Sequence, residues 1–414
     1  NLVRGFKHWL EDAEAITNGR QKKSAAQFEV GKDVAVTPGK VVYSNRLIEL
    51  LQYSPQTDSV YAEPILITPA WIMKYYILDL SPRNSMVRYL TEQGYTVFMI
   101  SWKNPTAADR DLGLDDYVQL GLREALDAVG AIVPDRRIHA VGYCIGGTLL
   151  SIGTALLAQQ GDTRIATVTL LAALTEFSEP GELSVFISPS QLAMLEAVMH
   201  KAGVLESERM GGAFTLLRSR DLLWTPAVNT YIRGERAKQN DLMSWNADGT
   251  RMPWRMHSEY LERLYLKNEL AAGTFSIGSQ PVNLQSIQLP MFVVGTETDH
   301  VAPWQAVYKV RTLTRSVDYT FLLTSGGHNA GIVSGPSHPK RRYRTLTWSD
   351  PGQRLSPDEW LTAAPVTAGS WWPAWQKWLA AHSQDKRVAA RPVTGMPGRK
   401  GQKLEDAPGR YVRE

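Results

Sequence analysis

The stretch Ile138-His-Ala-Val-Gly142-Tyr-Cys144-Ile-Gly146-Gly-Thr148 decides how this chain folds. Its first four residues are apolar apart from one histidine, which is typical of a short strand buried on both faces of a sheet. The segment 146–160 that follows has the composition of a helix. The five residues from Gly142 to Gly146 match the nucleophile elbow G-x-S-x-G, with cysteine in the serine position. The stretch therefore predicts a strand, a sharp turn that carries Cys144, and a helix.

Short apolar runs elsewhere extend this pattern into a sheet. They are separated by helical segments such as 115–130 and cover residues 64–68, 96–100, 138–142, 166–171, 290–294 and 319–323. Strands that alternate with helices favour an open, mostly parallel α/β sheet. Together with the elbow, the alternation predicts an α/β-hydrolase fold. Two further short strands, 34–36 and 41–43, are predicted to pair as a hairpin.

One long interval, 175–270, interrupts the alternation because it contains no sheet-type run. It is helical and polar in character, so we predict a largely helical cap inserted between sheet strands. The chain starts at Asn1 without a methionine, which favours a fragment trimmed from a longer protein. The predicted organisation is the trailing part of a removed N-terminal domain (1–30), the first part of the core (31–174), the cap (175–270), the second part of the core (271–384) and an extended basic C-terminal tail (385–414).

Composition narrows the class of protein. The 414 residues include 45 basic and 41 acidic side chains, a net charge of +4, and 43% are hydrophobic. The tail 385–414 holds eight basic and four acidic residues, so it accounts for the whole excess of positive charge. A neutral body argues against nucleic acid as a partner. No apolar run approaches the ~18 residues of a membrane span, and the start does not resemble a signal peptide.

The single cysteine, Cys144, excludes an intrachain disulfide and a thiolate zinc site, and it favours a reducing cytosol. Neither an H-E-x-x-H motif nor a nucleotide-binding loop is present, so no metal and no cofactor are expected. A lone cysteine is more often a small buried hydrophobe. Here the glycines and the flanking strand and helix favour a nucleophile. The N-terminus of the following helix favours a thiolate.

A cysteine nucleophile needs a base and an orienting carboxylate, which in this fold follow in the order nucleophile, acid, histidine. Asp299 follows the run 290–294, and His328 follows the run 319–323 in a glycine-rich loop. We therefore predict the triad Cys144, Asp299 and His328. The neighbouring His300 is a candidate for a substrate or cap contact.

Two backbone amides are expected to stabilise an oxyanion. One belongs to Ile145, directly after the nucleophile. In this fold the other comes from the loop after an earlier strand, which here contains Trp71.

The residues 142–148 (GYCIGGT) are similar to the box G-x-C-x-G-G-T of the polyhydroxyalkanoate synthases, and the ending resembles their class I type. The resemblance covers nearly the whole chain. Further similar segments are Phe28-Glu-Val-Gly31, Leu51-Gln-Tyr53, Lys74-Tyr-Tyr-Ile-Leu-Asp79-Leu80, Ser101-Trp102-Lys-Asn-Pro105, Asp299-His-Val-Ala-Pro303-Trp304, Gly327-His328, Ala330-Gly331, Gly369-Ser-Trp-Trp-Pro373 and Ala407-Pro-Gly-Arg-Tyr411-Val.

Within the cap, Arg218 and Tyr265 match positions of this family, so they are expected to contact substrate or to close the cap. The chain departs from the family at the oxyanion loop, where Trp71 and Met73 replace Cys and Asn. The Trp71 indole is therefore expected to border the acyl pocket or the underside of the cap, with plain core packing as the alternative.

The resemblance implies an enzyme that polymerises (R)-3-hydroxyacyl-coenzyme A into polyester and releases coenzyme A through an acyl-Cys144 intermediate. Coenzyme A is then part of the substrate and not a cofactor. The resemblance also implies a homodimer at the surface of cytoplasmic polymer granules, in contact with the growing polyester chain. Two alternatives remain open: a cysteine-dependent thioesterase or polyester depolymerase of the same fold, and a non-catalytic granule-associated protein.

Overall fold

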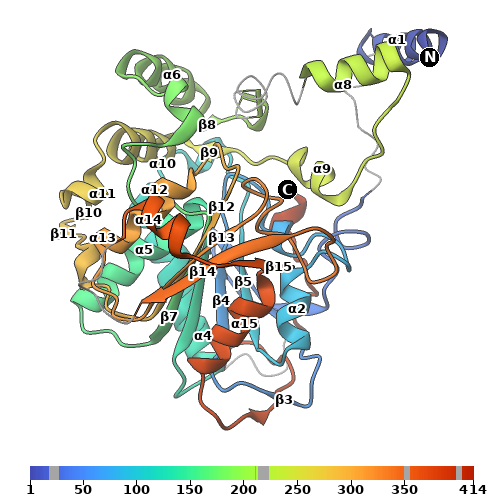
Figure 1. Ribbon diagram of the computed structural model, residues 1–414. Coiled ribbons are helices and arrows are strands. Elements are labelled where there is room, and N and C mark those ends of the chain that lie inside the picture. Colours follow the sequence, from blue (N-terminus) through green and yellow to red (C-terminus); the bar gives the residue numbers. More distant parts are fainter. Residues whose placement is uncertain (18–27, 210, 213–222, 349–354, 398–402) are drawn as a thin grey trace.

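A computed structural model describes residues 1–17, 28–209, 211–212, 223–348, 355–397 and 403–414 (Figure 1). Within them the largest sheet has ten strands. Their order across the sheet is β1 (Gly39–Ser44), β2 (Ile48–Tyr53), β5 (Val97–Trp102), β4 (Ile65–Thr68), β6 (Ile138–Tyr143), β7 (Ile165–Leu171), β12 (Met291–Thr296), β13 (Tyr319–Thr324), β14 (Arg342–Trp348) and β15 (Val366–Ala368). Neighbours from β5 to β13 are parallel, and the pairs outside this group are antiparallel.

Every apolar run identified in the sequence forms one of the central parallel strands, which confirms the predicted fold class. Side chains of adjacent strand residues enter opposite cores. Leu66 packs into one core, whereas Ile65 and Ile67 pack into the other. These strands are buried on both faces, and this is why their sequences read as continuous apolar runs.

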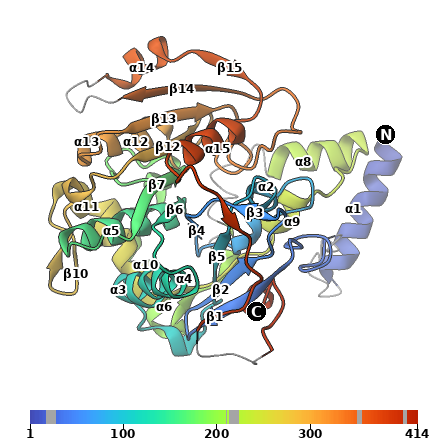
Figure 2. The same cartoon turned by 90° about the horizontal axis from the view of Figure 1, so that it is seen from below.

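Helices cover both faces of the sheet (Figure 2). One face carries α3 (Leu114–Asp116), η3 (Tyr117–Arg123), α4 (Glu124–Ile132), α5 (Ile145–Gln159), α12 (Trp304–Tyr308), α13 (Val310–Leu313) and α14 (Pro357–Ala363). The other carries η1 (Tyr75–Leu78), α2 (Met86–Glu92) and α15 (Trp372–Ala381). Smaller elements are β3 (Ser59–Val60), η2 (Ala107–Asp109), β10 (Ser276–Ile277), β11 (Gln280–Pro281), η8 (Leu284–Ser286), β16 (Val388–Ala389) and η9 (Tyr411–Arg413).

Most of the chain between β7 and β12 forms the cap, and much of it lies over the edge of the sheet where the parallel strands end (Figure 1). Its described elements are η4 (Gly181–Phe186), α6 (Pro189–Ala202), β8 (Val204–Leu205), α8 (Thr225–Ala227), η6 (Val228–Arg233), α9 (Asp241–Asn246), β9 (Met252–Pro253), α10 (Trp254–Glu259), η7 (Tyr260–Leu266) and α11 (Glu269–Ala272). Helix α1 (Leu2–Thr17) packs against η6, away from the sheet. Over the described ranges, no helix combines the length and the apolar character that crossing a bilayer requires.

The predicted hairpin within residues 34–43 is wrong. Strand β1 does form, but it pairs with β2, and Val34 makes only an isolated bridge with Val30. Ala35 has a φ of 54°, and its amide donates to the carbonyl of Asp79. The segment before β1 is therefore anchored to the end of η1 instead of extending as a strand.

The C-terminal tail lies against the body where the structure describes it. Strand β16 pairs with β3. Further along, the Glu49 carboxylate of β2 accepts hydrogen bonds from the amides of Arg410 at 3.0 Å and Tyr411 at 3.1 Å. Val412 is buried. The sequence predicted only an extended segment, because its anchor is a buried carboxylate far away along the chain.

The elbow between β6 and α5 leaves no room for side chains at its glycines. Cys144 takes a φ of 53° and a ψ of −129°, a strained conformation for a residue with a Cβ. A Cβ added to Gly142 would lie 2.4 Å from the Cα of Gly147. One added to Gly146 would lie 2.3 Å from the carbonyl oxygen of Thr68. Helix α5 therefore packs directly against the end of β4.

Gly146→Ala should lower the free energy of unfolding by ~1–3 kcal/mol, because the backbone at Thr68 cannot move aside. The control is Gly130→Ala in α4, where an added Cβ would meet no atom within 4 Å. This variant should be stabilised by ~0.5–1 kcal/mol, as is usual for Gly→Ala in a helix interior. Urea unfolding measures both changes. Equal stabilities of the two variants would contradict the close packing at the elbow.

Candidate active site

Cys144 stands at the turn between β6 and α5, where the helix begins. Its amide donates to the carbonyl of Leu171 at 2.9 Å, which ties the turn to the end of β7. The side chain is half-buried, and its sulfur lies close enough to the His328 imidazole to raise the pKa of that ring. A sulfur nucleophile is thus held beside a base.

Asp299 orients this base from the loop after β12. Its Oδ2 accepts hydrogen bonds from His328 Nδ1 at 2.8 Å and from Thr296 Oγ1 at 3.0 Å. Its Oδ1 accepts from the amides of Val301 at 2.9 Å and Ala302 at 2.8 Å. The carboxylate is fully buried but fully hydrogen-bonded. The structure thus brings Cys144, His328 and Asp299 together in the arrangement of a triad.

The electrostatics of the pair favour a charged imidazolium. Burial by itself would lower the pKa of His328, but the Asp299 carboxylate and the nearby Cys144 sulfur raise this pKa well above its ordinary value. Burial would raise the pKa of Asp299, but the His328 charge and the hydrogen bonds to the carboxylate hold it below its ordinary value. The site can therefore keep a proton on His328 next to the sulfur.

The His328 loop is braced by side chains that the sequence did not identify. Tyr143 Oη donates to Asn329 Oδ1 at 2.5 Å, and Trp371 Nε1 donates to the carbonyl of Gly331 at 3.0 Å. Tyr143 stands directly before the nucleophile, and its ring centroid lies 5.7 Å from that of His328. Its place next to Cys144 in the sequence was the only sign that Tyr143 lies at the site. The elbow motif allows any residue type at that position, so the motif did not single it out.

The predicted oxyanion groups lie beside one another. The Ile145 amide belongs to the first turn of α5 and has no hydrogen-bond partner among the residues that the structure describes. The close approach of Gly146 to β4 brings the loop after β4, which contains Trp71, next to this amide. Thr250 Oγ1 donates to the Trp71 carbonyl at 2.6 Å. The cap therefore holds the loop expected to supply the second donor, whose assignment remains a prediction.

The Trp71 side chain is packed in the core beneath the cap. It is 3% exposed, and its ring centroid lies 5.6 Å from that of Trp102 and 4.7 Å from that of Tyr117. Its Nε1 donates to the Met256 sulfur of α10 at 3.2 Å. The indole thus meets the underside of the cap. The next residue, Ile72, lines the cavity beside Cys144 instead.

The remaining candidate residues from the sequence lie at different places in the structure. His300 Nδ1 lies 3.1 Å from Glu182 Oε1 in η4, and its side chain is 44% exposed, so it links the core to the cap. Tyr265 is buried and lines the cavity above the nucleophile. Arg218 lies outside the described residues.

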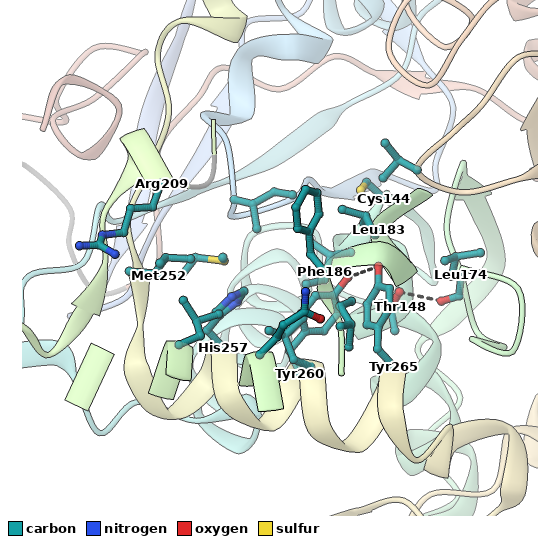
Figure 3. Close-up of a pocket in the computed structure, with 18 of the residues that line it drawn as sticks. Cys144, Thr148, Leu174, Leu183, Phe186, Arg209, Met252, His257, Tyr260 and Tyr265 are labelled. Atoms are coloured by element: carbon teal, nitrogen blue, oxygen red, sulfur yellow. Dashed lines mark hydrogen bonds between the residues drawn. The ribbon is translucent and has the colours of Figure 1, made fainter. Parts of the chain in front are cut away.

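A cavity of about 310 Å³ opens above Cys144 and is walled by the cap (Figure 3). Its lining is mainly apolar and includes Ile72, Leu174, Phe186, Met252 and Leu261. An apolar chamber of this kind suits an acyl chain and not a charged group. In the described ranges, His, Cys, Asp and Glu side chains form no cluster of three or more that could hold a metal ion.

Two cavity residues, Tyr260 and His257, were missed by the sequence analysis. The Tyr260 hydroxyl lies 3.2 Å from that of Tyr265. These tyrosines are five positions apart, and segment η7 between them is a π-helix. A π-helix repeats its hydrogen bonds every five residues, so it brings the pair together. Nothing in the sequence marks this local change of helix type.

Comparison with known proteins gives family matches over most of the chain. A model described as "Poly-beta-hydroxybutyrate polymerase (PhaC) N-terminus" matches residues 1–90, and one described as "alpha/beta hydrolase fold" matches residues 63–334. The chain is 41% identical to a poly(3-hydroxyalkanoate) polymerase of Methylorubrum extorquens, over 100% of this chain and 67% of that protein. It is 37% identical to a poly(3-hydroxyalkanoate) polymerase subunit of Rhizobium meliloti (strain 1021), over 100% of this chain and 66% of that protein.

The chain thus spans about two thirds of the length of these two relatives. Among solved structures, a soluble variant of monoglyceride lipase from Saccharomyces cerevisiae is similar, with a TM-score of 0.48 and 12% identity. That match covers 87% of this chain and 99% of the lipase.

Asp299→Asn should lower the pKa of His328. The charge that favours the imidazolium is removed, whereas burial, which favours the neutral ring, remains. NMR titration of the His328 ring in a Cys144→Ala background separates this effect from that of the sulfur. The control Asp318→Asn removes a carboxylate that pairs with His382 at 2.9 Å and should leave His328 unchanged. If His328 titrates identically in both variants, Asp299 does not set its charge.

Trp71→Cys should destabilise the fold by an amount approaching the ~3–5 kcal/mol typical of Trp→Ala in a core. Its preference between four- and six-carbon 3-hydroxyacyl-coenzyme A substrates should not change, because the indole does not line the cavity. Ile72→Ala, a change in the cavity wall, should alter this preference. Melting temperatures and relative rates measure both effects. A Trp71 variant with normal stability and an altered preference would show that the indole does shape the pocket.

Proposed function

The chain belongs to the poly(3-hydroxyalkanoate) polymerase family, and we propose that it polymerises (R)-3-hydroxyacyl-coenzyme A into polyester with release of coenzyme A. One observation carries this proposal: the Cys144 thiol opens into an apolar cavity beneath the cap, with the His328–Asp299 pair beside it. This arrangement presents a sulfur nucleophile to an uncharged acyl chain.

The first step transfers the acyl group to the enzyme. The Cys144 thiol gives its proton to His328, and the sulfur attacks the thioester carbonyl. The resulting oxyanion accepts a hydrogen bond from the Ile145 amide and another from the loop that contains Trp71. The carbon–sulfur bond to coenzyme A then breaks, and His328 returns the proton to the leaving thiolate. The products are acyl-Cys144 and free coenzyme A.

The second step joins two units. The 3-hydroxyl of another acyl-coenzyme A loses its proton to His328 and attacks the carbonyl of acyl-Cys144. The carbon–sulfur bond to Cys144 breaks, and the sulfur recovers the proton from the imidazolium. The extended chain is now a thioester of coenzyme A, which can acylate Cys144 again. Asp299 keeps the imidazole oriented in both steps through the hydrogen bond to Nδ1.

The choice of cysteine follows from the energetics of these two steps. Exchange of one thioester for another changes the free energy little, so acyl-Cys144 keeps the reactivity of the substrate. Formation of an oxyester from a thioester is downhill, so elongation drives the sequence. A serine nucleophile would form an oxyester in the first step and would leave little driving force for the second.

A thioesterase differs from the polymerase in the group that attacks acyl-Cys144, and a depolymerase differs also in the ester that acylates Cys144. Hydrolysis needs water at the carbonyl, whereas polymerisation needs water to be kept away. The apolar lining of the cavity, much of it contributed by the cap, supports the polymerase. The intact triad argues against a purely non-catalytic granule protein, which would have no use for it.

Assembly and location are proposed on the sequence resemblance. We propose a homodimer that acts at the surface of cytoplasmic polymer granules and stays in contact with the growing polyester. Helix α1 and the neighbouring segment 224–233 support contact with an apolar surface because they expose Leu2, Val3, Phe6, Trp9, Trp224 and Ile232.

Incubation with 3-hydroxybutyryl-coenzyme A, with free thiol and product followed together, tests the function. Polymer is the expected product, and Cys144→Ala should lower coenzyme A release by at least ~10⁴-fold, as for other catalytic nucleophiles. One equivalent of iodoacetamide should lower coenzyme A release in the same way, because Cys144 is the only thiol that it can alkylate. Free hydroxy acid without polymer would identify a hydrolase. Failure to release coenzyme A would leave the non-catalytic alternative.

A further inference from the structure

The loop that carries His328 has little rigidity of its own. It follows β13 and contains three glycines, Gly326, Gly327 and Gly331. Glycine adopts many backbone conformations, so a loop of this composition does not by itself fix the position of a side chain. The base must nevertheless stay beside the Cys144 sulfur and also reach a substrate hydroxyl, and both proton transfers need a well-defined geometry. The loop therefore needs support from outside.

Arg341 supplies such support at both ends of the loop. Its Nη1 donates to the carbonyl of Ser325 at 3.3 Å, and its Nη2 donates to the carbonyl of Ala330 at 2.9 Å. Ser325 precedes His328 by three residues, and Ala330 follows it by two. The guanidinium group is planar and rigid, so its two terminal nitrogens fix the separation of the two carbonyls. One side chain thus bridges the part of the loop that presents the base.

The backbone of the loop makes room for this guanidinium group. Gly326 has a φ of 112°, a conformation that residues with a Cβ rarely adopt. A Cβ added to Gly326 would lie 2.8 Å from Arg341 Nη1 and 3.1 Å from the Cα of Gly331. The carbonyl of Gly326 also accepts a hydrogen bond from the amide of Thr298 at 3.0 Å, which is next to Asp299 in the sequence. A shift of the loop would therefore also disturb the loop of the acid.

Arg341 is itself anchored in the sheet, because it directly precedes β14, which pairs with β13 and β15 (Figure 2). Its carbonyl accepts from the amide of Gly369 at 2.7 Å, and the carbonyl of Arg342 accepts from the amide of Ser325 at 2.9 Å. The Arg341 side chain is half-buried, and its Nη2 also lies 3.4 Å from His338 Nε2. The guanidinium group therefore projects from a fixed backbone and constrains the loop.

We infer that Arg341 is a positioning residue whose guanidinium group holds both ends of the His328 loop and so keeps the imidazole in place. The inference rests on the proposed function, which uses His328 in both steps. Asp299 orients the ring through Nδ1, whereas Arg341 fixes the backbone from which the ring projects. Arg341 is not among the described residues that line the cavity, so it should affect the rate of reaction and not the binding of substrate.

Single-turnover acylation of Cys144 by 3-hydroxybutyryl-coenzyme A tests the inference, with coenzyme A release followed over a range of substrate concentrations. Arg341→Ala removes both hydrogen bonds and should lower the maximal acylation rate by about 10- to 100-fold, because a small misplacement of a catalytic group is costly. The half-saturating concentration should not change. Arg341→Lys keeps the charge but offers a single nitrogen instead of a fork, so its rate should lie between those of Arg341→Ala and the unaltered protein.

The matched control is Arg344→Ala. Arg344 lies three residues further along the chain, and its Nη1 donates to the carbonyls of Leu361 at 3.3 Å and Ala364 at 2.7 Å. It thus also makes two hydrogen bonds to backbone carbonyls, but these lie at the end of α14 and not in the His328 loop. Arg344→Ala should keep the full acylation rate. Melting temperatures confirm that each variant is folded.

An unchanged maximal rate in folded Arg341→Ala overturns the inference, and so does an equal fall in Arg344→Ala or a change confined to the half-saturating concentration. If Arg341→Ala does not fold, Arg341→Lys decides, because a full rate in the folded Lys variant is then the overturning result. If the unaltered protein releases no coenzyme A, the proposed function itself fails. That outcome is read without any Arg341 variant, so the two failures are distinguishable.

Discussion

The close contact between the first turn of α5 and the end of β4 is the constraint on which the rest of the structure depends. The Gly146 Cα faces the carbonyl of Thr68 at a distance that excludes any Cβ. This contact forces Cys144 into a φ of 53° and presents its sulfur at the edge of the sheet. It also places the Ile145 amide beside the loop after β4. One steric constraint therefore positions both the nucleophile and the expected oxyanion site.

The central sheet and the triad could be predicted from sequence because their signals are local. A buried parallel strand is a short apolar run, and the acid and the base each follow such a run. The outer strands carry no such signal. Strand β2 contains Glu49, whose buried carboxylate is stabilised by amides of the distant C-terminal tail. Strand β14 is half-exposed and rich in Arg and Thr. Their pairing depends on partners that one segment of sequence does not reveal.

The sequence predicted a cap over the site, but it did not identify the polar residues of the cavity beneath that cap. Its hydroxyl pair exists because η7 is a π-helix, and this helix type has no sequence signature comparable to a nucleophile elbow. The expectation for Trp71 was partly met. Its ring contacts the cap at Met256 but lies in the core, and Ile72 lines the cavity. Two adjacent residues of one loop therefore lie in different places, one in the core and one at the cavity. Sequence reasoning does not distinguish these two positions.

The cap contributes to the site in two ways. It forms a wall of the apolar cavity, and it also holds the loop after β4. Thr250 donates to the Trp71 carbonyl, and Trp245 Nε1 donates to the carbonyl of Lys74 at 2.7 Å. A displaced cap would therefore admit water and release the expected oxyanion loop together. An acyl-Cys144 exposed to water would then also lose the groups that stabilise its tetrahedral intermediate. This coupling favours transfer to a hydroxyl in the closed site over hydrolysis in an open one.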